Sequence, residues 1–202
     1  MNKLIVIDCH GHVLGRVASV VAKNLLLGRR IVLVRCEDLQ VCGTLKMRLV
    51  QWRLYLRKRV NTNPLRGCFH QRSPADMVRK VIRGMLPKNN YRGKLALKHL
   101  TTCVGCPAPY DKMKKSSIPS AAAIYSFNPT RKRTLLKTLG RKIGWKYADV
   151  VEKNECERKE RAKKWFENKQ IREKAFNEAR AKILADEKYK AKVEILKKFG
   201  YA

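Results

Sequence analysis

The sequence predicts an α/β domain followed by a long, highly charged helix. Residues 4–7 (LIVI) and 31–36 (IVLVRC) are short β-type runs, and residues 16–27 between them repeat apolar residues at helical spacing. Strand, helix and strand at this spacing form a βαβ unit, which predicts a parallel pair with a right-handed crossover. Residues 146–198 contain neither proline nor glycine and consist mainly of good helix formers, which predicts the long helix.

The two helices predicted near the start of the chain are amphipathic. In 16–27 the apolar residues share one side, and Gly28 follows where a helix C′ residue is expected. In 44–59 the apolar positions recur at intervals of four, three and four residues: Leu45, Leu49, Trp52 and Leu56. Arg57 and Lys58 then point away from the core.

The middle of the chain is predicted to form short elements separated by turns. Ser73 is expected to cap a helix that has Pro74 at its first position and ends near Leu86. Its core side is expected to consist of Met77, Val78, Val81, Ile82 and Met85. The elements after it are expected to be a short helix at 92–100, a loop with at most a short strand at 101–120, an edge strand at 121–127 and a short helix at 134–140.

The charge distribution predicts a division of the chain into a domain at 1–151 and a helical extension at 152–202. Residues 1–151 contain 31 basic and 6 acidic residues, a net charge of +25, whereas residues 152–202 carry only +6. In the extension, pairs such as Glu157–Arg161 at i,i+4 support a helix. Its apolar residues are sparse and form no sustained heptad, so a solvated helix is favoured over a coiled coil. Alternatively, this helix lies along a partner surface that is acidic or made of RNA.

The net charge of +31 over 202 residues points to a polyanionic partner. Nucleic acid is favoured, because each neutralised phosphate releases condensed counterions. A membrane is disfavoured, since we find no lipidation motif and no apolar run long enough to span a bilayer. No secretory signal is apparent, and the seven irregularly spaced cysteines suggest reduced thiols, so we expect an intracellular protein.

The most informative segment is 66–94, which sets eight lysines and arginines against one acid, Asp76. Interspersed glycines and prolines hold these cations on short elements that point in several directions, as suits a folded polyanion. Arginine adds a planar fork that binds phosphate bidentately and stacks on unpaired bases. The candidate RNA-binding residues of this segment are Arg66, His70, Arg72, Arg79, Arg83, Lys88, Arg92 and Lys94.

Three further groups are candidates for RNA binding. Arg16 lies next to a predicted helix start, and Arg57 and Lys58 end the helix at 44–59. A proline-rich loop contributes Tyr110, Lys112, Lys114 and Lys115, where the tyrosine either stacks on a base or packs against its own domain. The last group comprises Arg131, Lys132, Arg133, Arg141 and Lys146 around Trp145, which is itself expected in the core.

Two motifs suggest other chemistry and are weak. Cys103 and Cys106 have half the spacing of a zinc knuckle, but a structural zinc site needs four ligands and no second paired motif is present. Asp8, His10 and His12 could serve a hydrolase, although glycines at 11 and 15 more plausibly shape a turn. We therefore expect no metal, no cofactor, no small-molecule substrate and no catalytic residue.

Four segments are distinctive: DCHGHVLGRVASVVAKNLLLG at 8–28, FHQRSPADMVRKVIRGMLPKNNYRGKLAL at 69–97, PAPYDKMKK at 107–115 and LGRKIGWKYADVV at 139–151. Together they resemble the universal large-subunit ribosomal protein L-thirteen family in its eukaryotic and archaeal form. The resemblance covers roughly residues 3–160 in the same order. It implies a small, mostly parallel sheet between helix layers and a non-catalytic place on large-subunit ribosomal RNA.

The expected function is therefore that of a structural constituent of the large ribosomal subunit. Its expected partners are ribosomal RNA and neighbouring ribosomal proteins, in the cytoplasm and, if the source is eukaryotic, in the nucleolus during assembly. An off-ribosome RNA-binding regulator of translation is the alternative. An RNA-processing enzyme using Asp8, His10 or His12 is a third and weaker hypothesis.

Overall fold

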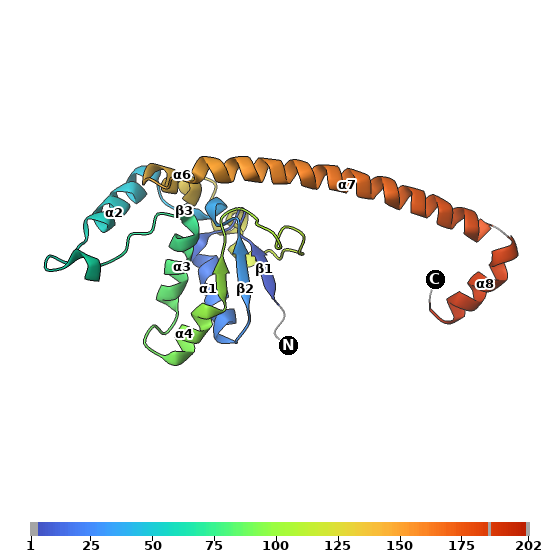
Figure 1. Ribbon diagram of the computed structural model, residues 1–202, viewed down its shortest axis with the longest axis horizontal. Coiled ribbons are helices and arrows are strands. Elements are labelled where there is room, and N and C mark those ends of the chain that lie inside the picture. The colour runs from blue at the N-terminus through green and yellow to red at the C-terminus, as the bar shows by residue number, and fades with distance from the viewer. Residues whose placement is uncertain (1–3, 186, 201–202) are drawn as a thin grey trace. The chain divides into compact units, whose positions relative to one another are not determined.

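The computed structural model describes residues 4–185 and 187–200 (Figure 1). Contacts within the chain separate two units, of which the first ends at Glu155 and the second begins at Cys156. The functional division at 151/152 stays a prediction.

The first unit is organised around a three-stranded parallel sheet with the order β1-β2-β4. Strand β1 (Ile5–Asp8) pairs with β2 (Ile31–Val34), and β2 pairs with β4 (Leu100–Thr102). All four residues of β2 are buried, as befits a central strand built from β-branched and aliphatic residues. The predicted βαβ unit is confirmed, and β4 is the short strand that was allowed for in the loop at 101–120.

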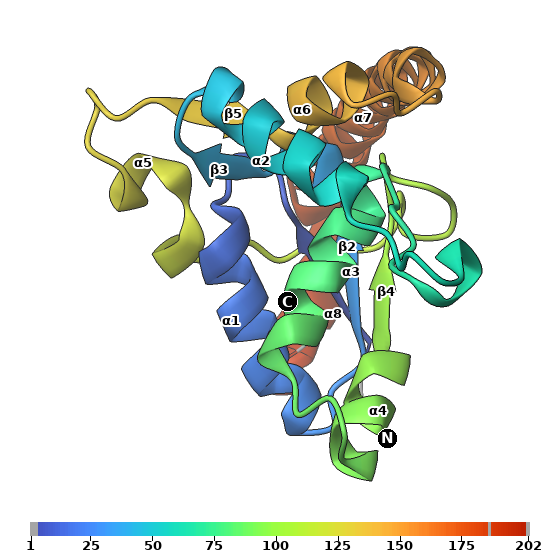
Figure 2. The ribbon, with the colours of Figure 1, turned by 90° about the vertical axis from the view of Figure 1, so that its left-hand side faces the viewer.

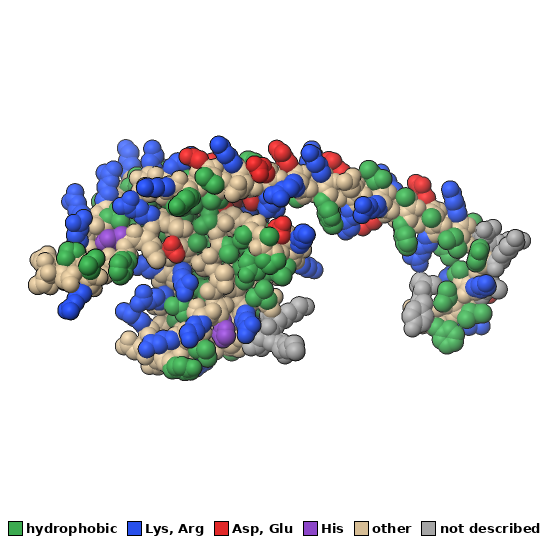
Figure 3. Space-filling view, viewed as in Figure 1, with side chains coloured by type: hydrophobic (Ala, Val, Ile, Leu, Met, Phe, Trp, Pro, Cys, Tyr) green, Lys and Arg blue, Asp and Glu red, His purple; other side chains and the backbone are tan. Residues whose placement is uncertain are grey.

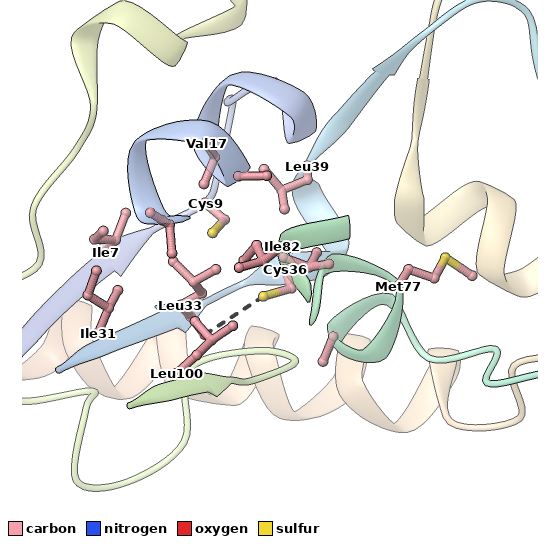
Figure 4. Close-up of a cluster of buried hydrophobic side chains, with 14 of the residues drawn as sticks. Ile7, Cys9, Val17, Ile31, Leu33, Cys36, Leu39, Met77, Ile82 and Leu100 are labelled. Atoms are coloured by element: carbon pink, nitrogen blue, oxygen red, sulfur yellow. Dashed lines mark hydrogen bonds between the residues drawn. The ribbon is translucent and has the colours of Figure 1, made fainter. Parts of the chain in front are cut away.

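Helices α1 (Leu14–Leu26) and α3 (Pro74–Met85) cover one face of this sheet and pack against each other (Figure 2). The core between helices and strands contains fully buried side chains, among them Val17, Leu33 and Ile82 (Figure 4). The apolar sides predicted for both helices are confirmed except at Met85, which is 44% exposed in the last turn of α3. Ser73 precedes α3 as predicted, but its side chain makes no capping hydrogen bond.

The other face of the sheet is covered by a loop. Val6, Val32 and Val34 point to this side and pack with the buried Cys106 and the half-buried Cys103 and Tyr110. The resemblance implied helix layers on both faces, and among the described contacts this second layer is not helical. The fold is thus of the α/β class, with a mostly parallel sheet and one clear helix layer.

A second, two-stranded sheet joins distant parts of the first unit. Strands β3 (Gln40–Cys42) and β5 (Arg133–Leu135) pair antiparallel, and neither was predicted. They lead into α2 (Leu45–Arg57) and α6 (Leu136–Lys142), two helices that contact each other. Thr44 caps α2 by accepting a hydrogen bond from the backbone N–H of Met47.

Short helical segments fill the connections. They are the 3₁₀ turns η1 (Cys36–Asp38), η2 (Pro64–Arg66) and η3 (Pro119–Ala121), with α4 (Tyr91–Lys98) and α5 (Ala123–Ser126). The edge strand predicted at 121–127 is wrong. Pro119 begins a 3₁₀ turn that ends at Ala121, and Ala123–Ser126 form α5, so most of the backbone is helical where a strand was expected.

The end of the chain is helical, as predicted. Helix α7 (Ala148–Ala185) starts in the first unit and continues in the second, and α8 (Glu187–Lys198) follows. The predicted uninterrupted helix at 146–198 starts two residues later in the structure, and its residue 186 lies outside the described residues. Among the described residues, no helix is long and apolar enough to cross a membrane.

Candidate RNA interface

The turn after β1 is a structural junction rather than a catalytic site. The backbone N–H of Ile118 donates to His12 Nε2 at 3.1 Å, and His12 Nδ1 lies 2.7 Å from the carbonyl oxygen of His10. One ring nitrogen of the buried His12 therefore holds the segment that begins at Ile118, and the other lies against the backbone of the turn itself. His10 Nδ1 lies 2.9 Å from Asp38 Oδ2. The histidines and Asp8 thus form no common site.

Asp8 is engaged by Arg35, whose guanidinium donates two hydrogen bonds to the carboxylate. Burial alone would raise the pKa of Asp8, but the bonds from Arg35 and from the backbone N–H of His10 outweigh it, so the pKa is lowered. Arg35 lies at φ 54°, in the left-handed region that side chains rarely adopt. The ion pair therefore stabilises an unusual backbone at the end of β2.

The segment with Cys103 and Cys106 is held by a buried carboxylate. Glu37 accepts the backbone N–H of Gly105 at 3.0 and 2.9 Å with its two oxygens, and burial raises its pKa. Within the described part of the chain, no group of three His, Cys, Asp or Glu side chains could hold a metal ion. None of the seven cysteines forms a disulfide bond, and Cys9 and Cys36 are buried whereas Cys68 is exposed.

The candidate RNA-binding residues are largely accessible. Seventeen of the twenty are exposed, and only His70, Tyr110 and Lys115 are half-buried. Arg141 forms ion pairs with Asp149 and Glu152, the latter at 3.3 Å. Among the described residues, none of the other candidate lysines and arginines forms an ion pair. Their charges are therefore available to an external anion.

The turn from α3 to α4 forms a basic notch. It has a volume of about 380 Å³ and is lined by Arg83, Leu86, Lys88, Asn89, Gly93, Lys94 and Leu97. Three cations thus surround an apolar floor beside the first turn of α4, where helix N–H groups favour an anion. Figure 3 shows lysine and arginine side chains gathered around α4 and, separately, over α2.

The structure brings Arg72 to the segment that contains Arg141 and Lys146. The guanidinium of Arg72 lies over Gly144, 2.9 Å from the position that a Cβ there would occupy. The carbonyl of Arg72 and the ring of Pro74 also lie close to Gly140. Two candidate groups that are about 70 residues apart in the sequence therefore meet at one place.

The small β3–β5 sheet joins a further candidate group to α2. The backbone N–H of Gly43 donates to the carbonyl of Lys132 at 2.9 Å, so the exposed Arg131, Lys132 and Arg133 lie beside the start of α2. At the other end of α2, His70 Nε2 lies 3.0 Å from the carbonyl oxygen of Lys58. The His70 ring also packs edge-on against Tyr55, so this histidine holds a loop in place.

The proline-rich loop lies on the sheet face opposite to α1 and α3. The Tyr110 ring packs against the buried cluster of Val6, Val32 and Val34, and Lys115 Nζ donates to the carbonyls of Asp111 and Met113. Lys112 and Lys114 remain exposed. The loop is thus separate from the basic notch.

Two accessible aromatic side chains within the basic segment were missed in the sequence. Phe69 and Tyr91 are each 78% exposed and are flanked by arginines at 66, 72 and 92. Asn89, which lines the notch, was also missed. Aromatic residues inside a basic run were the signal that could have found them, because unpaired bases stack on such rings.

Comparison with known proteins assigns the chain to a family. A sequence model of the family described as ribosomal protein L13 matches residues 2–109. The large ribosomal subunit protein uL13 of Dictyostelium discoideum is 47% identical over 165 residues, which cover 82% of this chain and 88% of that protein. The chain belongs to the ribosomal protein L13 family. The uL13 protein of Spodoptera frugiperda is 45% identical over 158 residues, or 78% of either chain.

Family membership defines the general role of the chain. Members of the ribosomal protein L13 family are structural, non-enzymatic components of the translation machinery. The chain is therefore a ribosomal protein and not an enzyme, which agrees with the use of Asp8, His10 and His12 in structural contacts. The match at 2–109 includes the βαβ unit and the basic notch.

Proposed function

We propose that this chain is a structural constituent of the large ribosomal subunit that binds folded ribosomal RNA through the first unit. The observation that carries the proposal is the basic notch between α3 and α4, with Arg83, Lys88 and Lys94 around it. All three side chains are exposed and lack an ion-pair partner among the described residues. The two relatives are named as large-subunit proteins, which supports the same assignment.

The chemistry of the notch suits a phosphate-bearing backbone. Three cations around a hollow of about 380 Å³ neutralise neighbouring phosphates, and the release of counterions drives binding. Arg72, near Gly144, and the group at 131–133 extend the positive surface toward α6 and α2. Phe69 and Tyr91 offer exposed rings on which unpaired bases can stack.

The remaining candidate residues differ in the role that each is proposed to have. Lys112 and Lys114 form a separate contact for phosphates, whereas the packed Tyr110 positions the loop that carries them. Arg141 combines an RNA contact with its ion pairs to Asp149 and Glu152. Residues 1–151 serve as the RNA-binding domain, and 152–202 as a charged helical extension.

The proposed partners are large-subunit ribosomal RNA and neighbouring ribosomal proteins. The proposed location is the cytoplasmic ribosome, with a nucleolar stage of assembly in a eukaryotic cell. The chain then contributes to translation by fixing the shape of RNA during subunit assembly.

The test is a competition between two RNAs for the purified full chain at physiological salt. Labelled fragments of large-subunit RNA are displaced either by the same unlabelled fragment or by a shuffled RNA of equal length and composition. We expect the matched competitor to displace at a concentration at least ten-fold lower than the shuffled one. Equal displacement by both RNAs would contradict a specific place on ribosomal RNA.

A further inference from the structure

In the second unit, three of the six large apolar side chains of α7 lie along one side of the helix, and nothing described covers them. Trp165, Phe176 and Ile183 are eleven and seven residues apart. An α-helix turns about 100° per residue, so both spacings return to the same side. The three side chains are 64%, 68% and 51% exposed. Such an array of large exposed side chains marks an interaction surface.

Arginine follows the same side of the helix. At about 100° per residue, all four arginines between 156 and 185 fall within roughly 60° of the line through Trp165, Phe176 and Ile183. They are Arg158, Arg161, Arg172 and Arg180. Lys169 is on this side as well, and its Nζ lies 5.7 Å from the centre of the Trp165 ring.

The opposite side of the helix has a different composition. Glu160, Glu167 and Glu178 lie there together with Lys163 and Lys174, so the charges are mixed. Glu173 borders the aromatic side and is paired with Lys169 at 3.3 Å. The helix thus separates its arginines, Trp165 and Phe176 from most of its glutamates and lysines, whereas Phe166, Ile171 and Leu184 lie elsewhere around the helix. A merely solvated helix has no physical reason for this separation.

We propose that this side of α7 binds RNA at a segment with unpaired bases. The aromatic–arginine face consists of Trp165, Lys169, Arg172, Phe176, Arg180 and Ile183. Arginine differs from lysine in that its planar fork binds phosphate bidentately and stacks on bases. Aromatic rings add stacking that tolerates any base. Arginine rather than lysine predominates beside the exposed rings, and this choice of cation favours RNA.

Other occupants fit this face less well. A second copy of the chain would oppose two positively charged faces, and like charges repel. A lipid surface requires a broad apolar face, whereas here arginines separate the aromatic side chains. A protein partner would need an acidic surface and is an outcome of the test below.

The direct test places a photo-crosslinker in the full chain within assembled large subunits. p-Benzoylphenylalanine replaces Phe176 in one protein and Glu178, on the opposite side, in a control protein. We expect RNA crosslinks from position 176 and at least five-fold fewer from position 178. Crosslinks from position 176 to protein alone, or equal RNA crosslinking from both positions, would overturn the inference.

A third probe separates this inference from the proposed function of the first unit. The same crosslinker replaces Tyr91, which is exposed beside the basic notch. RNA crosslinks from position 91 without any from position 176 would overturn only the assignment of α7. Absence of RNA crosslinks from position 91 would count against the RNA contact of the first unit.

Paired substitutions test the chemistry in binding to deproteinised large-subunit RNA. Arg172→Lys/Arg180→Lys keeps the charge but removes the planar forks, and the matched control is Lys163→Arg/Lys174→Arg on the opposite side. We expect about three-fold weaker binding or more for the first pair and less than a two-fold change for the control. Trp165→Ala/Phe176→Ala should weaken binding about ten-fold or more through lost stacking. Circular dichroism verifies that α7 stays helical, and unchanged affinity in the helical variants would overturn the inference.

Discussion

Gly93 in α4 lies directly against the carbonyl oxygen of Pro87. A Cβ added at Gly93 would stand 2.0 Å from this oxygen and 2.8 Å from the carbonyl carbon. No side-chain rotation can relieve such a contact, because both opposing atoms belong to the backbone. The start of α4 therefore packs against the beginning of the α3–α4 turn only because residue 93 is glycine. This approach sets the shape of the basic notch.

Substitution of Gly93 should therefore damage both stability and RNA binding. We expect Gly93→Ala to lower the free energy of unfolding by about 2 kcal/mol, since the turn must move to relieve the overlap. RNA affinity should fall with it, because Lys88 and Lys94 are carried by the displaced segments. Urea denaturation and RNA titration measure the two effects.

Gly84 in α3 provides the matched control for Gly93. A Cβ at Gly84 would meet nothing within 4 Å, and the residue is exposed near the end of a helix. Gly84→Ala should therefore stabilise the protein by about 0.5–1 kcal/mol through helix propensity, with RNA binding unchanged. Equal effects of the two substitutions would contradict the role given to Gly93.

The notch cations should determine part of the salt dependence of RNA binding. Each phosphate contact contributes roughly 0.7 to 0.9 to the slope of log affinity against log salt concentration. Arg83→Ala/Lys88→Ala/Lys94→Ala should therefore reduce that slope by about 2 to 3 and weaken binding at physiological salt. A variant with a similar loss of charge, Lys163→Ala/Lys164→Ala/Lys174→Ala, should change the slope by less. If both variants reduced the slope by the same amount, the notch cations would contribute no more to RNA binding than the lysines of α7.

The Asp8–Arg35 ion pair should make stability depend on pH below about 4. The pKa of Asp8 is lowered in the folded protein, so its contribution is complete above the ordinary value of 3.8 and is lost as pH falls through the folded value. Asp8→Asn should lower the free energy of unfolding by about 1 kcal/mol at pH 7 and by less at pH 3. Urea denaturation at the two pH values measures this difference. Asp111→Asn is the control, because an amide oxygen can still accept the N–H of Lys112. If Asp8→Asn lowered the free energy of unfolding equally at both pH values, this result would count against the ion pair.

Tyr110 should matter for folding more than for RNA contact. Because its ring packs against the cluster of Val6, Val32 and Val34, Tyr110→Ala should lower the free energy of unfolding by about 1–2 kcal/mol. Tyr91→Ala, which removes an exposed ring, should leave stability nearly unchanged and weaken RNA binding. Thermal denaturation and RNA titration distinguish the two residues. Weaker RNA binding by Tyr110→Ala at unchanged stability would reverse this assignment.

The main elements of the fold were predictable because their sequence patterns are strong. The βαβ unit, the partly buried apolar side of α2 and the position of Ser73 before α3 all follow from local spacing and turn residues. Strands β3 and β5 are three residues each, too short to show an alternation, and their pairing depends on contacts between residues more than 90 positions apart. The strand predicted at 121–127 was wrong, because nothing in the local sequence shows that Ala121 and Ala123 are buried against other parts of the fold.

The candidate interface was predictable in composition but not in arrangement. The density of cations at 66–94 is visible in the sequence, whereas the notch depends on the packing of Gly93 against Pro87. The approach of Arg72 to Gly144 and the ion pairs of Arg141 likewise arise only from tertiary contacts. From the sequence alone, Tyr110 could either stack on a base or pack within its own domain. Only the fold shows that it is packed.

Sedimentation of the tagged chain from its own cells, after a high-salt wash of the ribosomes, measures whether the chain is a structural part of the large subunit. We expect one copy of the chain per large subunit, retained through the wash and comigrating with large-subunit RNA. Release of the chain into the light fractions would contradict a structural place in the subunit and favour an off-ribosome regulator.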